Sequence, residues 1–304
     1  MTSPSDDETR AGLVYALGAY LLWGFFPLYW ALLKAAPATE VLGHRIVGTF
    51  VLLAGWLVLR GRLETLRGLG RRRWLLLAAA SSLISVNWLT YIWGVMNGHV
   101  VETSLGYFIN PLVSVGLGVW FLGERLRGGQ RFAIGLATVA VVILTLDYGR
   151  VPWIAGILAA SFALYGLLKK KAGVAAVPAL FIETALIAPL ALGWLVHLRL
   201  SGADTLLRLG GGHDALLLLA GLVTAVPLLL FGAGANRVPL STLGVLQYVA
   251  PCIQFLCGVT FLGEPMPPTR LAGFALVWAS LMVFTWDGLR ARRQVRSDGA
   301  MGSS

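Results

Sequence analysis

The stretch "PLVSVGLGVWFLGERLRGGQR", residues 111–131, returns in related form as "PCIQFLCGVTFLGEPMPPTR" at residues 251–270. Both copies open with proline, and the tetrapeptide Phe-Leu-Gly-Glu recurs in both, ending at Glu124 and at Glu264. Each copy is a long apolar run followed by a short polar connection. A unit that recurs in this way indicates a chain built from two structural repeats.

Composition places the chain in a lipid bilayer. Of its 304 residues, 57% are hydrophobic and only 12% are charged, and the mean hydropathy is +0.77. A helix needs about 20 mostly apolar residues to cross the hydrocarbon core, and runs of this length recur without the alternation of barrel strands. We therefore expect an all-α integral membrane protein with ten transmembrane helices. They are expected at about residues 11–33, 39–59, 74–95, 103–122, 130–147, 151–168, 177–199, 214–235, 240–262 and 270–287.

The two repeats are expected to face opposite ways. Ten spans divide into two units of five, and because five is odd the second unit enters the membrane from the other side. The first repeat then covers residues 11–147, and the inverted second repeat covers residues 151–287. Residues 1–10 and 288–304 are expected to form tails on the same, cytoplasmic side.

The distribution of Lys and Arg predicts this orientation. With the N-terminus inside, eighteen of the 24 Lys and Arg residues lie in cytoplasmic segments, five lie in external loops, and Arg45 falls within a span. This asymmetry follows the positive-inside rule. The net charge of +10 therefore indicates orientation and contact with anionic lipid, and we expect no nucleic-acid partner.

The inverted repeat predicts transport. Two halves of one fold that face opposite ways supply two states of similar energy, open to opposite sides of the membrane. We expect a secondary transporter that moves a small organic molecule by alternating access, without a cofactor. Two alternatives stay open: an intramembrane enzyme that uses His99, Glu102 or His44, and a bundle that does not transport. No motif of a zinc protease, serine hydrolase or P-loop supports an enzyme.

Polar side chains within the spans are candidates for function, because they are costly in hydrocarbon. Asn87 and Tyr91 are four residues apart and share a helix face, as a wall of a substrate site requires. The alternative is that Asn87 only bonds a neighbouring helix. The expected substrate-binding residues are Asn87, Tyr91, Tyr107, Asn110, Gln247, Tyr248, Trp23 and Arg45.

Three ionisable residues lie deeper than the ends of their spans. Arg45 can meet an anionic group of the substrate, or its side chain can extend outward to water. Glu183 is the most deeply placed carboxylate and, with His44, is our candidate for proton coupling. The alternative for Glu183 is a structural carboxylate that bonds the backbone or an arginine near the helix end.

Pro111 and Pro251 are expected to produce kinks related by the repeat. Each lies within a span, where a proline removes one helical hydrogen bond and favours a bend. Polar residues flank both prolines, so we expect these kinks to act in gating. A bend that serves packing alone is the alternative.

The stretch Gly94–Val101 is expected to form an external hairpin, with Asn97 and His99 as turn residues that face water. Glu102 then begins the fourth span, where a carboxylate favours the positive end of the helix. The two Cys residues are five positions apart in one span and point to different helix faces. We expect neither a disulfide nor a metal site.

Several blocks of the sequence resemble the RarD group of EamA-domain transporters, in the drug/metabolite transporter superfamily. They are "YALGAYLLWGFFPLYW" at 15–30, "HR" at 44–45, "NWLTYIWGVMNGHVVETSLGYFINPLVSVGLG" at 87–118, "ERL" at 124–126 and "FLGE" at 261–264. The resemblance covers about residues 11–287 and implies two EamA repeats in a bacterial inner membrane. It also implies a central cavity lined by spans one to four and six to nine, with spans five and ten as outer scaffold.

The resemblance leaves the substrate open. RarD-like proteins are labelled by chloramphenicol sensitivity, and other members of the superfamily export amino acids, other metabolites or drugs. We therefore expect an exporter of a metabolite or a drug-like molecule. Whether protons drive it, and whether the chain forms a homodimer, stay open.

Overall fold

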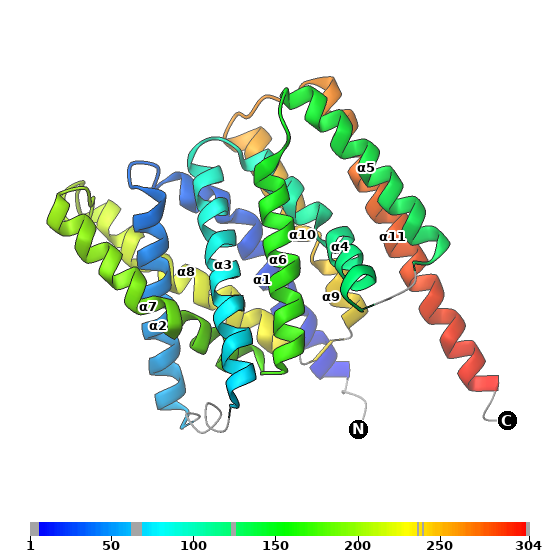
Figure 1. Ribbon diagram of the computed structural model, residues 1–304, viewed down its shortest axis with the longest axis horizontal. Coiled ribbons are helices and arrows are strands. Elements are labelled where there is room, and N and C mark those ends of the chain that lie inside the picture. The colour runs from blue at the N-terminus through cyan, green and yellow to red at the C-terminus, as the bar shows by residue number, and fades with distance from the viewer. Residues whose placement is uncertain (1–5, 62–68, 123–125, 236, 239, 302–304) are drawn as a thin grey trace.

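The computed structural model describes residues 6–61, 69–122, 126–235, 237–238 and 240–301, and every regular element in them is a helix (Figure 1). Glu124, which we matched to Glu264, lies outside the described residues. The elements are α1 (Asp6–Ala31), α2 (Ala38–Leu59), α3 (Arg71–Met96), α4 (Val100–Leu122), α5 (Gly128–Tyr148), α6 (Trp153–Ala172), α7 (Ala176–Ser201), α8 (Gly211–Ala235), α9 (Leu240–Leu246), α10 (Val249–Leu256), the π-helix η2 (Cys257–Phe261) and α11 (Pro268–Met301).

Ten crossings build the fold. Within the described residues, nine helices are long and apolar enough to span a membrane, namely α1 to α8 and α11. The tenth crossing consists of α9, α10 and η2 in series. The all-α membrane fold predicted from hydropathy is therefore confirmed. The first and the last helix of the chain are longer than expected, since α1 begins at Asp6 and α11 continues to Met301.

The expected span at 240–262 is not one helix. The chain leaves the helical pattern at Gln247 and Tyr248, and Pro251 follows in the first turn of α10. A proline ring clashes with the carbonyl four residues earlier, here that of Gln247, and its missing N–H costs nothing in the first turn of a helix. The break therefore precedes Pro251 by one turn. Pro111, in contrast, lies within the uninterrupted helix α4.

Both chain ends lie on the same side of the bundle, which we call the terminal face (Figure 1). The other side, where α1 ends and α2 begins, is called the opposite face. The site described below lies nearer to the opposite face. The connections on the opposite face are residues 32–37, 97–99, 149–152, 202–210 and 262–267.

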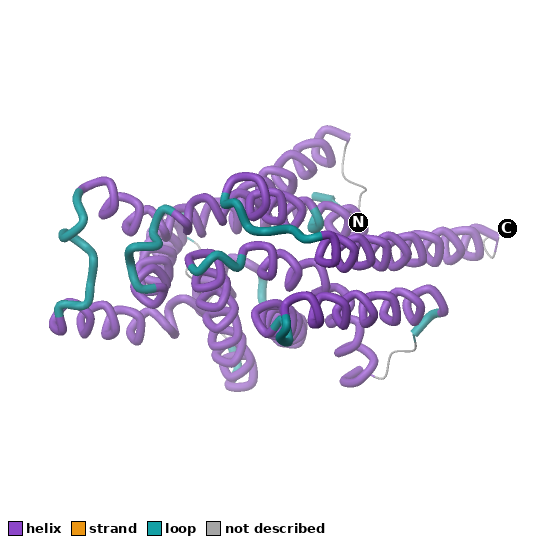
Figure 2. Tube along the Cα trace, turned by 90° about the horizontal axis from the view of Figure 1, so that it is seen from above, coloured by secondary structure: helices purple, strands orange, loops and turns teal. Residues whose placement is uncertain are grey.

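The helix contacts repeat when the two halves of the chain are exchanged. α3 packs against α6, and α8, which has the corresponding place in the second half, packs against α1. In the same way α4 packs against α6 and α10 against α1. α2 packs against α7 and α5 against α11, so these four helices pair with their own counterparts. The α5–α11 pair forms one end of the bundle, and α11 extends beyond it in Figure 2.

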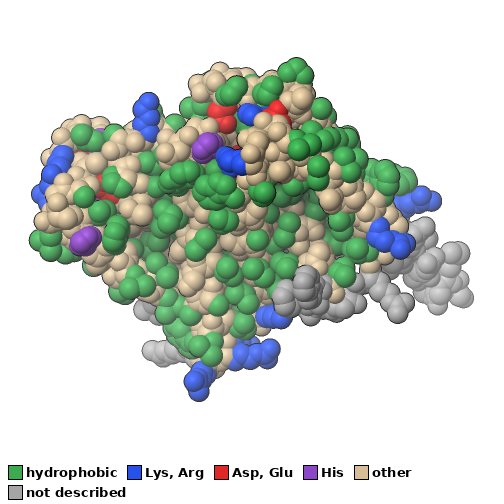
Figure 3. Space-filling view, turned by 45° about the horizontal axis from the view of Figure 1, so that its top comes forward, with side chains coloured by type: hydrophobic (Ala, Val, Ile, Leu, Met, Phe, Trp, Pro, Cys, Tyr) green, Lys and Arg blue, Asp and Glu red, His purple; other side chains and the backbone are tan. Residues whose placement is uncertain are grey.

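The surface around the bundle is apolar. Leu190 and Leu218 are 70% and 63% exposed, and Met282 is 66% exposed, as expected for side chains that face lipid. Figure 3 shows hydrophobic side chains over much of one face, with acidic, basic and histidine side chains gathered near the top of the view. Polar groups that are not on the faces must therefore be sought in the interior.

Candidate functional site

Asn87 of α3 is the centre of a buried hydrogen-bond network. Its amide nitrogen donates to the Leu158 carbonyl and to the Ser161 hydroxyl of α6, both at 3.0 Å. Its carbonyl oxygen accepts from the Tyr107 hydroxyl of α4 at 3.2 Å. Asn87 lies nine residues before the end of α3, which is roughly 13 Å along the helix axis. The network therefore joins three helices near the middle of the membrane.

Arg45 of α2 lies in an aromatic box instead of an ion pair. Its guanidinium carbon is 4.0 Å from the ring centroid of Trp88, 5.3 Å from that of Trp30 and 6.0 Å from that of Phe26. Arg45 is only 4% exposed, so its side chain does not extend outward to water. Its Nε and Nη1 atoms are buried and have no hydrogen-bond partner. Phe26 and Trp30 belong to α1 and Trp88 to α3, so side chains of two helices enclose a cation carried by a third.

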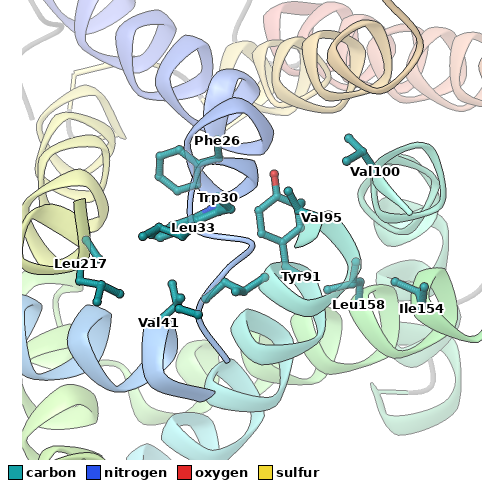
Figure 4. Close-up of a cluster of buried hydrophobic side chains, with 13 residues drawn as sticks. Phe26, Trp30, Leu33, Val41, Tyr91, Val95, Val100, Ile154, Leu158 and Leu217 are labelled. Atoms are coloured by element: carbon teal, nitrogen blue, oxygen red, sulfur yellow. The ribbon is translucent and has the colours of Figure 1, made fainter. Parts of the chain in front are cut away.

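Tyr91 joins this box to the Asn87 network. Its ring packs edge-on against that of Tyr107, with centroids 5.6 Å apart. Figure 4 shows Phe26 and Trp30 of α1 facing Tyr91 of α3 within one buried cluster. The Tyr91 hydroxyl and the Asn110 carbonyl oxygen are buried without a partner. Four of the expected residues thus form one centre, Arg45, Asn87, Tyr91 and Tyr107. We count with them Asn110, which lies one helical turn after Tyr107 on α4, and call the five residues the polar centre.

The other expected binding residues are Trp23, Gln247 and Tyr248, and Trp23 packs against the hydrophobic cluster that contains Phe26, Trp30 and Tyr91. The Trp23 ring packs against Tyr20 and Phe231, while its carbonyl accepts from the Gln254 amide at 3.1 Å. Gln247 stands at the break before α10. Tyr248 packs against the cluster that joins α4, α5 and α11. Their assignment to a substrate site stays a prediction.

Glu183 lies toward the terminal face. It is 1% exposed, seven residues into α7, and its two oxygens lie 3.0 Å from Lys169 Nζ and 3.0 Å from the Tyr165 hydroxyl, both of α6. The Ser81 hydroxyl of α3 donates to its backbone carbonyl at 2.6 Å. Glu183 therefore joins three helices and is paired with a basic side chain near a helix end. This arrangement is similar to our alternative interpretation, with a lysine in place of the expected arginine.

His44 lies one turn beyond Glu40 near the start of α2. Glu40 is fully buried, and its oxygens accept from the Thr205 backbone N–H at 2.9 and 3.0 Å and from its hydroxyl at 2.9 Å. The Thr205 hydroxyl also lies 2.8 Å from His213 Nε2. Among the described residues no hydrogen bond joins Glu40 to His44. The carboxylate instead fixes the connection between α7 and α8.

Asp204 stabilises the same connection. It forms ion pairs with Arg199 at 2.9 Å and with Arg208 at 3.0 Å. The hydrogen bond from Arg199 and the charges of both guanidinium groups hold the pKa of Asp204 below its usual value. This connection is therefore held by charges at the membrane surface.

Two carboxylates connect helices at the opposite face through hydrogen bonds. Glu264, after η2, accepts hydrogen bonds from the backbone N–H groups of Val100 and Val101, at the N-terminus of α4. Glu102, in the first turn of α4, accepts from the Ile154 N–H of α6 at 3.1 Å and from Arg150 at 2.6 Å. Carboxylates are favoured at the positive N-terminal ends of helices. We call Glu264, Glu102 and Arg150 the carboxylate latch.

The carboxylate latch borders a cavity of about 290 Å³ that Gly98, His99 and Arg270 also line. The hairpin beside it is tighter than expected: only residues 97–99 are outside the helices, and Gly98 has the left-handed φ of +72°. The His99 ring stacks on Trp93 at 5.8 Å. Among the described residues, no group of three His, Cys, Asp or Glu side chains could hold a metal ion.

Sequence reasoning missed the partners of several predicted residues. Ser161, Trp88 and Lys169 complete the contacts of Asn87, Arg45 and Glu183, respectively. We expected the Glu102 carboxylate to stabilise the N-terminus of its own helix, α4. In the structure it accepts a hydrogen bond from the N-terminus of α6, and Glu264 accepts those from the N-terminus of α4. The recurrence of Glu264 in the repeat was a signal for it. The other partners come from helices far apart in sequence, which periodicity does not pair.

Comparisons with known proteins identify the family. Residues 10–146 match the EamA-like transporter family. Protein RarD of Streptomyces exfoliatus is 52% identical over 96% of this chain and 94% of its own length, and the uncharacterized transporter YojE of Bacillus subtilis is 42% identical over 95% and 98%. A crystal structure of 19% sequence identity aligns over 90% of this chain and 96% of its own with a TM-score of 0.59, which shows the same fold. The chain belongs to the EamA-like transporter family, as a RarD homologue within the drug/metabolite transporter superfamily.

Proposed function

We propose that the chain is a secondary transporter that moves a small organic molecule across the bacterial inner membrane by alternating access. The observation that carries this proposal is the polar centre. Its unpaired Arg45, Tyr91 and Asn110 atoms are buried among apolar side chains, where unsatisfied polar groups are costly unless they serve a ligand. The centre lies roughly 10–15 Å along the helices from the opposite face, close to the middle of a 30 Å hydrocarbon layer.

The repeated helix contacts support the alternation. Because α3–α6 corresponds to α8–α1, and α4–α6 to α10–α1, the two halves can exchange their roles with similar contacts on either side. A fold of this kind has two conformations of similar energy, in which a central site is open to one face or to the other. We propose the inverted repeats 11–147 and 151–287 as the units that exchange.

Basic side chains support a cytoplasmic terminal face. Arg71–Arg73 begin α3 and Lys169–Lys171 end α6 at this face. Clusters of Lys and Arg favour the cytoplasmic side, where the leaflet is anionic. In this orientation the carboxylate latch closes the external side, and its release during the cycle lets the substrate leave the cell.

Glu183 is our candidate for coupling to protons. It is buried between α3, α6 and α7, and Lys169 lies at its carboxylate. Movement of α6 against α7 changes the distance to Lys169, and a carboxylate that loses its cation in hydrocarbon binds a proton more readily. Uptake driven by a pH gradient into vesicles with wild-type protein or Glu183→Gln tests this role. If both variants respond equally to the gradient, Glu183 does not couple.

Counterflow in proteoliposomes tests the transporter itself. Purified protein is reconstituted, and unlabelled amino acids, aromatic acids, nucleosides or chloramphenicol are loaded inside before a labelled trace of the same solute is added outside. We expect at least one solute to accumulate transiently, and Asn87→Leu to reduce this accumulation. Matched liposomes with Asp287→Asn, a change on the exposed Arg127–Asp287 pair at the terminal face, serve as the control. A full panel without counterflow would contradict the proposal.

A further inference from the structure

Arg45 is a buried cation that has no counter-charge among the described residues. Within the described residues no carboxylate lies within ion-pair distance of its guanidinium, which contacts the rings of Phe26, Trp30 and Trp88. Nε and Nη1 together carry three N–H donors, and neither atom has an acceptor. Aromatic faces attract a cation but offer it no hydrogen-bond acceptors.

The buried carboxylates are already engaged elsewhere. Glu40 accepts from Thr205 and Leu206, Glu102 pairs with Arg150, and Glu183 pairs with Lys169. Asp147 and Asp204 also have arginine partners. A buried cation left alone is strongly unfavourable, whereas a paired one is tolerated. No described residue supplies the acceptor that Arg45 needs, and a bound molecule can supply it.

The surroundings of Arg45 restrict what this acceptor can be. The guanidinium is enclosed by rings that favour an apolar or aromatic body. One cation compensates one negative charge, and a doubly charged group would leave an excess charge in hydrocarbon. A carboxylate is planar and matches the guanidinium in two parallel hydrogen bonds. The Tyr91 hydroxyl and the Asn110 carbonyl oxygen add a donor and an acceptor for a further polar group.

We propose that the transported molecule is an organic monoanion, a small carboxylate with an apolar or aromatic body, whose carboxylate binds Arg45. This inference rests on the proposed function and names the substrate class of the same site. Arg45 lines neither the cavity of about 290 Å³ nor that of about 300 Å³, and it is only 4% exposed, so its side chain is shielded from solvent in this conformation. The anion reaches it when the helices separate on one face.

Binding calorimetry on the full chain in lipid nanodiscs at neutral pH tests the charge preference. The probes are benzoate, phenylacetate, 3-phenylpropionate and indole-3-acetate, each compared with its own primary amide, which keeps the shape and removes the charge. We expect at least one acid to bind roughly 10- to 100-fold more tightly than its amide, the range expected when a charged hydrogen-bonded pair is lost. If no acid binds at millimolar concentration, or if every amide binds as tightly as its acid, the inference is wrong.

Variants of Arg45 show whether the preference for the acid over its amide arises at this residue. Arg45→Gln is expected to bind the acid no better than the amide, and Arg45→Lys, which keeps the charge, to restore part of the difference. Arg208→Gln removes a positive charge from the opposite face and is expected to keep the wild-type preference. Size-exclusion profiles show which variants fold. A folded Arg45→Gln that prefers the acid as strongly as the wild type does would overturn the assignment. If Arg45→Gln does not fold, an Arg45→Lys that keeps the full wild-type preference overturns it instead.

The transport assay separates the two proposals. Counterflow of neutral solutes that is unchanged in Arg45→Gln would refute the anion site and leave the transporter standing. Binding of acids that requires Arg45, without counterflow of any solute, would refute the transporter and leave the anion site standing.

Discussion

Replacing Glu264 with Gln is expected to release the closed opposite face. Glu264 holds the N-terminus of α4 through the N–H groups of Val100 and Val101, and it follows η2, so it ties the second half of the chain to the first. Gln keeps the size of the side chain, removes its charge and replaces one of the two accepting oxygens by an NH2 group, which cannot accept an N–H. The change therefore weakens this contact without opening space in the core.

The size of the effect follows from the two hydrogen bonds. Hydrogen bonds to a charged group contribute about 1.5–3 kcal/mol each, and neutral ones about 0.5–1.5 kcal/mol. Glu264 is half-buried, so water and salt screen part of its charge and the lower end of the difference applies. One hydrogen bond to the charged group is lost and the other becomes neutral, so we expect a loss of about 2–3 kcal/mol, which raises the population open at this face roughly 30- to 150-fold.

Cys257 is a natural probe for this opening. It is 1% exposed, it belongs to η2, and a Cβ on the adjacent Gly258 would lie 3.0 Å from the Val101 side chain of α4. In a Cys252→Ser background, which removes the exposed second thiol, the labelling rate by a membrane-impermeant maleimide follows the open population. We expect Glu264→Gln to raise this rate by the factor given above.

Two results would refute this reasoning. One is an unchanged labelling rate in Glu264→Gln. The other is an equal increase in Asp287→Asn, which loses a carboxylate from the Arg127–Asp287 pair at the terminal face and keeps the latch intact. Equal increases would show that loss of any carboxylate loosens the fold, and that Glu264 has no particular role in closing the opposite face.

Three further changes test the packing, the polar centre and the surface charges. Gly221→Ala places a Cβ 2.4 Å from the Gly48 carbonyl carbon, so we expect the free energy of unfolding to fall by about 1–3 kcal/mol. At Gly55 a Cβ would meet no atom within 4 Å, so Gly55→Ala should raise the free energy of unfolding by up to about 1 kcal/mol. Thermal unfolding in detergent compares the two variants. Asn87→Leu removes three hydrogen bonds worth about 0.6 kcal/mol each in a membrane, so its unfolding free energy falls by about 2 kcal/mol, and wild-type stability would contradict the network. The pKa of Asp204 is lowered in the folded state. Its ion pairs therefore stabilise the folded protein fully above the unfolded pKa of about 4, and this stabilisation is lost as the pH falls through the folded pKa. The unfolding temperatures of wild type and Asp204→Asn, measured from pH 7 downward, should converge in acid.

The sequence predicts the crossings well because a single physical quantity, the apolar length, determines them. Each expected span from the first to the eighth corresponds to one helix of the structure, with shifts at the ends. The ninth differs because hydropathy does not register a break: Gln247 and Tyr248 are followed by apolar residues, and only Pro251 indicates that the helix stops. The π-helical turn at Cys257–Phe261 leaves no signal in the hydrophobic pattern.

The polar centre was predictable in part. Helical periodicity places Asn87 beside Tyr91, and the structure adds Tyr107 from α4 to the same face. The rotation of each helix against its neighbours is not contained in periodicity, so the sequence does not predict that the Trp23 ring packs on Phe231 of α8 or that Tyr248 packs against the cluster of α4, α5 and α11. Partners such as Ser161 are fixed only when α3 packs on α6.

The two halves place opposite charges at equivalent positions. Arg45 lies seven residues into α2, counted from the opposite face, and Glu183 lies seven residues into α7, counted from the terminal face. Glu183 is paired with Lys169, whereas Arg45 has only rings around it, so the two halves differ in charge balance. Rearranging helices around an uncompensated cation in hydrocarbon is costly, and an anion bound to Arg45 removes that cost. The empty protein should therefore change state more slowly than the loaded one, and this difference makes movement of the helices depend on the substrate.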